Sequence, residues 1–328
     1  MPRSLNPRHG SLQVWPRVRA KRHYARIRHL AKFKEAKPFE FAGYKVGMTH
    51  IFITDNRQHS RTKGEEIRMP VTILECPPLK VASIRAYKRN AQGLFASSEA
   101  FVSVEKNLGR KVVVPKKQNS KLDEIGANLS GVEEIRIVVF TQPQFIGKAK
   151  RKPELFEMRL GGSVEEQFNF AKDKVGKEIR LQDIFKEGQQ IDTYAVTKCH
   201  GFQGPVKRFG VTLRQHKSEK AIRAPANVGP WTGNRSWTVA HAGQTCFHQR
   251  MERNKWVVAI RDKPEELKVS GGFIRYGFPK ATFMLLKGSV QGSSKRMIRF
   301  ALSSRPNKIF PSQAPSVESI SLHSQQGN

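Results

Sequence analysis

Residues 45–54 read KVGMTHIFIT, a stretch in which apolar and polar residues alternate and β-branched side chains are common. This pattern predicts a β-strand that is buried on one face. Further short segments of the same character are separated by Gly, Pro and Asn, which favour turns. These segments are VTILEC (71–76), KVASIRAY (80–87), IRIVVF (135–140), DTYAVTK (192–198), KWVVAI (255–260), TFMLLKG (282–288) and RMIRFA (296–301).

The predicted strands come from both ends of the chain, and the sequence between them mixes helix and strand patterns. Many short strands with such an interruption are typical of a β-barrel that carries an inserted domain. We therefore expect a mixed α+β fold that is mainly β. The barrel is expected to take residues 41–90 and 190–302, and the inserted α/β domain residues 91–189.

One helix is expected within the inserted domain, at residues 163–176. Ser163 has the right chemistry for an N-cap, and Glu166 stands three residues later, as in a capping box. Apolar residues then recur at helical spacing until Gly176, a common helix stop. A second, shorter helix is expected after Ser120.

The chain of 328 residues has 59 Lys and Arg against 27 Asp and Glu, a formal net charge of +32. A compact domain carries a net charge of roughly 2–8, so this excess indicates a polyanionic partner, either nucleic acid or an anionic membrane. The longest apolar runs, such as IVVF (137–140), are far shorter than the roughly 20 residues of a membrane-spanning helix. No amphipathic helix with a basic face is evident either, which makes nucleic acid the favoured partner.

Part of the positive charge lies in an N-terminal arm, residues 1–40, in which the first carboxylate is Glu35. The arm has Pro2, Pro7 and Pro16 and few apolar residues, so we expect it to become ordered only against an anion. Aromatic residues alternate with arginine in the arm, which suits stacking on bases. These aromatic residues are Trp15, Tyr24 and Phe33.

Residues 100–190 are nearly balanced in charge, with 17 Lys and Arg against 13 Asp and Glu. Mixed charges indicate an ordinary solvated surface, so we expect this part to face water more than phosphate. The last residues, 303–328, are rich in Ser, Gln and Pro, and we expect a flexible tail.

The three cysteines, Cys76, Cys199 and Cys246, are an odd number in a long chain. We therefore expect no disulfide framework and a reducing, cytosolic compartment. Cys199-His200 with Cys246 and His248 lacks the usual C-x₂₋₄-C spacing of a zinc site. No acidic residue lies near to support a thiol nucleophile, so neither a metal nor a catalytic site is expected.

The long connection between two predicted strands, residues 195–261, has twelve Lys and Arg but only two acids, Glu219 and Glu252. Connections of this length are usually functional or disordered. It contains six Phe and Trp residues, too many for a solvated linker, and several glycines that allow close approach to a sugar-phosphate chain. A loop that enters folded RNA needs this composition.

Three blocks within this connection resemble the archaeal-eukaryotic form of the L-three family of large-subunit ribosomal proteins. They are GFQGPVKRFGVTLR (201–214), NVGPWTGNRSWTV (227–239) and AGQTCFHQRMERNK (242–255). Blocks elsewhere agree in order, among them FAGYKVGMTHI (41–51), GGSVEEQFNFAKDKVGKEIR (161–180), GGFIRYG (271–277) and FMLLKGSVQGSSKRMIR (283–299). The resemblance covers most of the chain.

The resemblance implies a non-enzymatic primary rRNA-binding protein that helps nucleate assembly of the large subunit in the cytoplasm. It implies a barrel related to those of translation proteins and a finger loop, residues 201–255, that reaches toward the peptidyl-transferase centre. Partners would be large-subunit rRNA and neighbouring ribosomal proteins, with translation factors docking near by. It implies no cofactor, no membrane and no homo-oligomer.

The sequence departs from the family pattern at three places. CHGFQG (199–204) stands where archaeal relatives usually have GKGFQG, and WTGNRSW (231–237) stands where the family has WHPAR and a later Trp. Residues 90–131 look shortened. These changes put the geometry of the finger tip, around residues 231–237, in question but leave the positive charge in place.

We expect rRNA contacts from arginine, which binds phosphate in a bidentate manner, from lysine, and from aromatic rings that stack on bases. In the arm these are Arg3, Arg8, Trp15, Arg17, Arg19, Lys21, Arg22, Arg26 and Arg28. In the finger they are Phe202, Gln203, Lys207, Arg208, Arg214, Lys217, Arg223, Trp231, Arg235, Trp237, Gln244, His248, Arg250 and Arg253. The alternative is a basic RNA-modifying enzyme, but the sequence offers only isolated titratable groups and no convergent set.

Overall fold

The computed structural model describes residues 14–28, 33–102, 105–114, 121–146, 150–218, 221–225, 233 and 238–323. The chain divides into two compact units, which are described separately. Unit 1 takes Met1–His23 and Val196–Arg250, and unit 2 takes Tyr24–Ala195 and Met251–Asn328.

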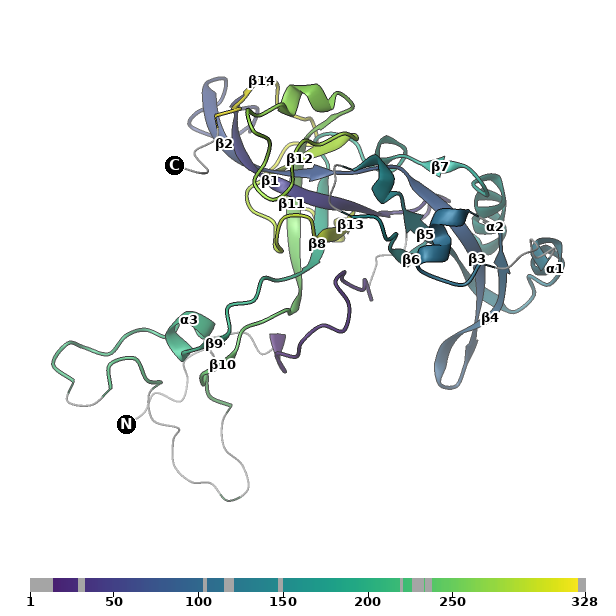
Figure 1. Cartoon of the computed structure of the whole chain (residues 1–328), viewed down its shortest axis with the longest axis horizontal. Helices are drawn as coiled ribbons and strands as arrows, with labels where there is room; N and C mark the ends of the chain where they lie inside the picture. The colour runs from purple at the N-terminus through teal and green to yellow at the C-terminus, as the bar shows by residue number, and fades with distance from the viewer. Residues whose placement is uncertain are drawn as a thin grey trace. The chain divides into compact units, whose positions relative to one another are not determined.

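Unit 2 contains most of a seven-stranded antiparallel sheet, in the order β13-β8-β11-β12-β2-β1-β14 (Figure 1). Strand β13 also pairs with β1, so six of these strands form a closed ring and β14 adds to β1 outside it. The strands are β1 (Glu40–Thr54), β2 (Glu66–Glu75), β8 (Gln190–Val196), β11 (Gln249–Arg261), β12 (Phe283–Lys287), β13 (Met297–Leu302) and β14 (Val317–Ile320).

Strand β1 spans 15 residues, long enough to pair with β13 through its first third and with β2 through most of its length. A bulge between Lys45 and Gly47 shifts the register within the β1–β2 pairing. At Gly43 a Cβ atom would lie 2.6 Å from the sulfur of Cys76, so the position requires glycine. Close packing of β1 against the end of β2 thus explains a small residue in a strand.

A second sheet, in the order β4-β3-β5-β6 with β7 paired to β3, forms the rest of unit 2. Its strands are β3 (Leu79–Asn90), β4 (Gly93–Phe101), β5 (Val132–Thr141), β6 (Leu155–Arg159) and β7 (Glu178–Ile179). Strand β3 was expected in the barrel, so the predicted boundary at residue 90 is too late. Pro77 and Pro78 separate β2 from β3, because proline cannot donate to a sheet ladder.

Two short helices accompany the second sheet, α1 (Lys121–Ala127) and α2 (Val164–Asp173). Helix α2 confirms the predicted capping box. The hydroxyl of Ser163 accepts from Glu166 N, and the carboxylate of Glu166 accepts from Ser163 N. Gly176, at φ +72°, lies just beyond the helix, as expected. The 3₁₀ helices of unit 2 are η2 (Lys106–Arg110), η3 (Pro143–Phe145), η4 (Leu181–Asp183) and η5 (Pro264–Leu267).

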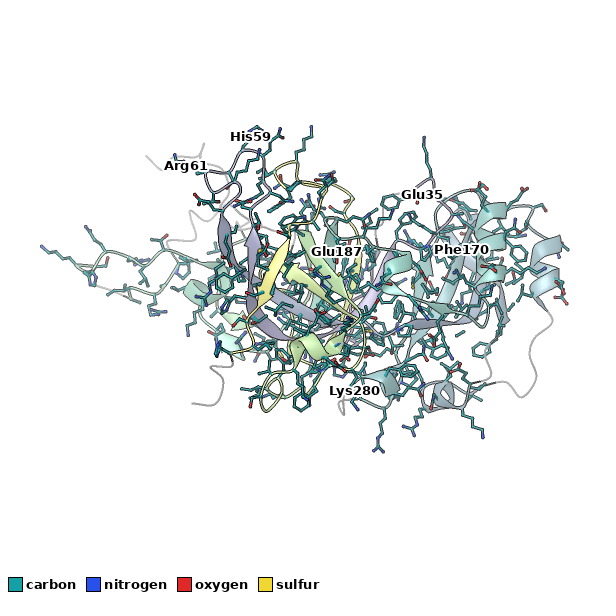
Figure 2. The ribbon with its side chains drawn as sticks, turned by 90° about the horizontal axis from the view of Figure 1, so that it is seen from above. Glu35, His59, Arg61, Phe170, Glu187 and Lys280 are labelled. Atoms are coloured by element: carbon teal, nitrogen blue, oxygen red, sulfur yellow. A yellow bond between two sulfur atoms is a disulfide. The ribbon has the colours of Figure 1, made fainter. Side chains whose placement is uncertain are left out.

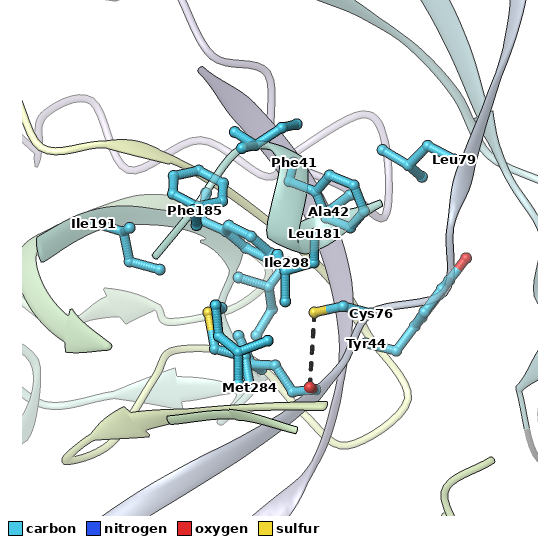
Figure 3. Packing of buried hydrophobic residues seen from close by; sticks show 14 of the residues in the cluster. Phe41, Ala42, Tyr44, Cys76, Leu79, Leu181, Phe185, Ile191, Met284 and Ile298 are labelled. Carbon is cyan, nitrogen blue, oxygen red and sulfur yellow. Dashed lines mark hydrogen bonds between the residues drawn. The ribbon is translucent and has the colours of Figure 1, made fainter. Parts of the chain in front are cut away.

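One buried hydrophobic cluster runs through both sheets of unit 2. Figure 3 shows part of it, where Phe41 of β1 lies near Leu181, Phe185 and Ile298. Each such side chain contributes roughly 1.5–3 kcal/mol by leaving water. The buried core is therefore large enough to stabilise unit 2.

Two aromatic residues expected to stack on bases instead pack within unit 2. Tyr24 donates its hydroxyl hydrogen to Leu155 O at 2.9 Å, and the ring of Phe33 stacks on Phe39 with centroids 4.0 Å apart. Ala25 and Ile27, which follow Tyr24 in the sequence, are also buried. The expectation that the arm becomes ordered only against an anion is therefore wrong for residues 24–28.

The segment after residue 303, expected to be a flexible tail, is placed against the closed sheet as far as His323. Strand β14 pairs with β1, Ile51 opposite Ile320, and Phe310 packs against Trp256 with ring centroids 5.3 Å apart. Scattered apolar residues among Ser and Pro are enough to anchor the segment on an existing surface.

A buried ion pair joins the two strands that close the ring. Arg299 of β13 donates to the carboxylate of Glu40 of β1, and the two side chains are 5% and 2% exposed. Arg299 also donates to Glu157 O at 2.8 Å, and its guanidinium lies 4.5 Å from the centroid of the Phe156 ring. The pair thus connects the closed sheet to β6.

Exposed charges surround this interior. Figure 2 shows His59 and Arg61 extending from the loop between β1 and β2. In the second sheet, by contrast, cations are paired with carboxylates, for example Arg89 with Glu133 at 2.5 Å and Arg85 with Glu99 at 2.8 Å. Carboxylates near the middle of the chain are thus paired with cations of the same sheet.

Candidate nucleic-acid interface

Unit 1 is the most basic part of the protein. Its two segments, Met1–His23 and Val196–Arg250, contain fifteen Lys and Arg but one acid, Glu219. Fifteen like charges repel one another unless an anion lies among them. The contacts within unit 1 determine where these charges lie.

A small ladder forms the scaffold of unit 1. Strands β9 (Phe202–Gln203) and β10 (Gly243–Gln244) pair antiparallel, as Figure 1 shows. Backbone hydrogen bonds extend the ladder, because His200 N donates to Thr245 O and Thr245 N donates to Gly201 O, both at 2.8 Å. The ladder brings together residues about 40 positions apart and holds the base of a long loop.

Helix α3 (Pro205–Phe209) follows β9 and fixes the orientation of two side chains at the interface, Arg208 and Phe209. Pro205 stands in the first turn, where its missing N–H is not needed. Gly210, at φ +70°, ends the helix in the left-handed region.

Cys199 and Cys246, which are 47 positions apart in sequence, form a disulfide with Cα atoms 3.9 Å apart. The expectation of no disulfide is therefore wrong for this pair, although Cys76 stays free and buried. The β9–β10 ladder brings the two positions together, which cysteine spacing alone does not reveal. With their sulfurs bonded to each other, the pair has no thiolate for zinc or for nucleophilic attack, and no group of three metal ligands occurs among the described residues.

The disulfide leads to a prediction. Protein purified without reductant and then denatured should show one reactive thiol, from Cys76, and three after reduction. Alkylation followed by intact mass measurement counts them. Replacing both Cys199 and Cys246 by serine should speed proteolysis between residues 196 and 250, because the base of the loop loses a cross-link. Three thiols before reduction would contradict the disulfide.

The arm segment within unit 1 packs on α3. Trp15 stacks on Phe209 with ring centroids 5.3 Å apart. The guanidinium of Arg17 lies 4.1 Å from the centroid of the same ring, and its Nη1 donates to Arg208 O at 2.9 Å. Trp15 was expected to stack on a base, but one face of its ring is covered by protein. The expectation that the arm becomes ordered only against an anion is also wrong here.

His248 was expected to contact rRNA, and the structure corrects this. The side chain is 3% exposed and both ring nitrogens are used. Cys246 N donates to Nε2 at 3.2 Å, which leaves Nδ1 to donate to Val18 O at 3.0 Å. Ala20 N also donates to Phe247 O at 2.7 Å. His248 therefore fastens the arm to the base of the loop, and both of its ring nitrogens are occupied by protein partners.

Three arginines expected to bind rRNA, Arg17, Arg208 and Arg250, repel one another and form what we call the arginine cluster. Burial, and then the charge of Arg208, lowers the pKa of Arg17. Burial, and then the charge of Arg17, lowers the pKa of Arg250. The sequence of unit 1 has one acid, Glu219, which lies outside the described residues.

Arg208 is placed for this cluster by its neighbours. Its Nη1 donates to His241 O at 3.0 Å. A Cβ atom at residue 243 would lie 2.8 Å from the guanidinium carbon, so Gly243 leaves room for it. Guanidinium groups held in this way suit phosphate, which they bind in a bidentate manner.

The other expected contact residues are placed in three ways. Phe202 is 69% exposed, and the remaining exposed ones are Arg19, Lys21, Arg22, Arg26, Arg28, Lys207, Lys217, Arg223, Gln244 and Arg253. Gln203 and Arg214 use their side chains on the backbone of unit 1, donating to His200 O at 2.7 Å and Pro225 O at 3.2 Å. Arg3, Arg8, Trp231, Arg235 and Trp237 lie outside the described residues.

Phe209 and Phe247, which hold the arm, were not among the expected site residues. Arg208-Phe209 places a ring beside a cation in the sequence, and that adjacency is a signal that sequence reasoning could have used.

Comparison with known proteins decides the family. The family model described as Ribosomal protein L3 matches residues 1–327. The chain belongs to the ribosomal protein L3 family. Large ribosomal subunit protein uL3 of Archaeoglobus fulgidus is 43% identical over 92% of this chain and 93% of its own. The uL3 proteins of Methanopyrus kandleri and Methanosphaera stadtmanae are 42% and 41% identical over 98% and 100% of this chain, and over 91% and 100% of their own.

These comparisons confirm the resemblance to the archaeal form of the family. Membership in a family of ribosomal proteins also confirms that the chain is not an enzyme. None of the described helices is long and apolar enough to cross a bilayer.

Proposed function

We propose that this protein is a structural constituent of the large ribosomal subunit in the cytoplasm, and that unit 1 binds rRNA. The arginine cluster carries the proposal: like charges are partly buried together on a built scaffold with one acid in the whole unit. Like charges held this close repel one another in the free protein, and a phosphate bound among them would offset this repulsion. The names of the uL3 relatives support the location.

Contacts of unit 1 would be made mainly to phosphate and sugar. Arg17, Arg208 and Arg250 each use Nη1 on a backbone carbonyl and would offer their other guanidinium N–H groups to phosphate. The exposed ring of Phe202 supplies a surface on which an unpaired base can stack. Phosphate contacts position a protein without reading sequence, so specificity would come from the shape of the folded RNA.

Further parts of the proposal rest on the family resemblance. The closed ring of strands would be the translation-protein type of β-barrel, and the loop held by β9 and β10 would be the finger that reaches toward the peptidyl-transferase centre. The protein would bind rRNA early, help nucleate assembly, contact neighbouring large-subunit proteins and lie near docked translation factors.

Deleting residues 231–237 tests the finger role. Unit 2 should fold normally, since the deleted segment belongs to unit 1, but large-subunit maturation or peptidyl transfer should be impaired. Gradient profiles and a peptide-release assay on a strain carrying the deletion measure both. A matched deletion in the loop between β1 and β2, residues 57–63, serves as control. Normal profiles and normal peptidyl transfer in the 231–237 deletion would contradict the role.

A further inference from the structure

A third basic segment lies in unit 2, outside the arm and the loop of unit 1. Residues 267–317 contain no Asp or Glu, and the neighbouring acids in sequence are Glu266 and Glu318. Lysine and arginine occur nine times in this span: Lys268, Arg275, Lys280, Lys287, Lys295, Arg296, Arg299, Arg305 and Lys308. Arg299 is buried and paired with Glu40, but an acid-free span of this length indicates that the exposed cations among the others are not neutralised by neighbouring residues of the span.

Part of this span forms a hollow of about 440 Å³ lined by residues 270–277 and Lys295. The loop folds back on itself, with Phe273 N donating to Gly277 O at 3.0 Å and Gly277 N donating to Phe273 O at 2.9 Å. Phe273 and Tyr276 turn inward and belong to the hydrophobic core. Ile274 and Arg275, between them, stay exposed.

A buried carboxylate holds one side of the hollow in place. Glu75 is fully buried and accepts from the hydroxyl of Tyr276. It also accepts from Lys280 N at 2.6 Å and from Ala281 N at 2.8 Å. Figure 2 labels Lys280, whose backbone N–H makes one of these bonds. With three donors on one carboxylate, the chain from Tyr276 to Ala281 is fixed to the end of β2.

A buried ammonium holds the other side. The Nζ of Lys45, which is 8% exposed, donates to Val290 O and to Gly292 O. Lys295 N donates in turn to Lys45 O at 2.8 Å. The turn that carries Lys295 is therefore fixed to β1, and the hollow is formed before any ligand arrives.

The two cations that line the hollow have strained backbones. Arg275 has φ +61° and Lys295 φ +68°, in a region where glycine is the usual residue. Four described non-glycine residues have positive φ, and two of them are the cations of this hollow. Neither side chain lies within ion-pair distance of a carboxylate among the described residues. A long cationic side chain kept at a position suited to glycine indicates a role for the charge.

We propose that this hollow binds the phosphate backbone of an RNA strand, as a contact separate from unit 1. Arg275 and Lys295 bind successive phosphates, and Ile274 and Phe278, both 46% exposed, offer apolar surface to unpaired bases. This inference rests on the proposed rRNA-binding function.

The test uses the full chain with both cations replaced, Arg275→Gly and Lys295→Gly. Glycine suits these backbone angles, so the melting temperature should equal or exceed that of the wild type. The probe is an in vitro transcript of large-subunit rRNA, titrated at several salt concentrations. The slope of log affinity against log salt should become shallower by about two, one for each lost phosphate contact.

The control is Arg89→Gly with Lys177→Gly, which removes the same charge from exposed, ion-paired positions of unit 2. Its slope should stay within about half a unit of the wild type. A wild-type slope in the Arg275 and Lys295 variant would overturn the inference and leave unit 1 as the binding site. The same slope with poor incorporation into subunits would indicate a protein partner and also overturn it. Failure of the wild type to bind the transcript would overturn the proposed function itself.

Discussion

Replacing the arginine cluster, Arg17, Arg208 and Arg250, by glutamine should weaken binding to large-subunit rRNA about a hundredfold at 0.15 M salt. Each neutralised phosphate contributes about 0.9 to the slope of log affinity against log salt, so three contacts contribute about 2.7. From 1 M, where this contribution vanishes, to 0.15 M, it amounts to roughly two powers of ten. Filter binding across this salt range measures both the slope and the affinity.

A matched control separates this effect from general charge. Replacing Lys37, Arg89 and Lys177 by glutamine removes three cations that already pair with Glu35, Glu133 and Asp173. We expect little change of slope, because their charge is already balanced within the protein. Equal losses in the two triple variants would show that the cluster has no special role.

Replacing Glu40 by alanine should lower the free energy of unfolding of unit 2 by about 3–5 kcal/mol. Arg299 would then be a buried cation without its carboxylate, which is the most damaging way to break such a pair. This is a large part of the roughly 5–15 kcal/mol that typically stabilises a domain. Denaturant unfolding followed by fluorescence of Trp256, which is 1% exposed, measures the change.

The double variant Glu40→Leu with Arg299→Met provides the control. Both charges are then absent, no unpaired ion remains, and we expect a smaller loss than in Glu40→Ala. If Glu40→Ala unfolds at the wild-type midpoint, the ion pair does not stabilise the closure of the ring.

Local patterns predicted much of the fold. All of the strands expected from alternation or short apolar runs are present, because burial of one or both faces leaves a direct trace in sequence. Helix α2 was predicted because its capping box is a local interaction. Strand β4 was missed because GLFASSEAF shows no strict alternation and is exposed along most of its length, so pairing with β3 and not burial makes it a strand.

The candidate site was predicted less completely, because its key contacts join distant residues. The charge of the arm and the loop is visible in the sequence. The packing of Trp15 on Phe209 and the bonding of Cys199 to Cys246 require the β9–β10 ladder, which has only two pairs of residues. His248 has the composition of an RNA contact, but the carbonyl of Val18 decides its role.

Sedimentation of a native lysate tests the central claim most directly. After separation on a sucrose gradient at moderate salt, an antibody against this protein should detect it in the large-subunit and ribosome fractions. High salt should release it only when the subunit itself comes apart, because in the proposed function the folded rRNA surrounds its contacts. Detection at the top of the gradient, free of the large subunit, would contradict the ribosomal function.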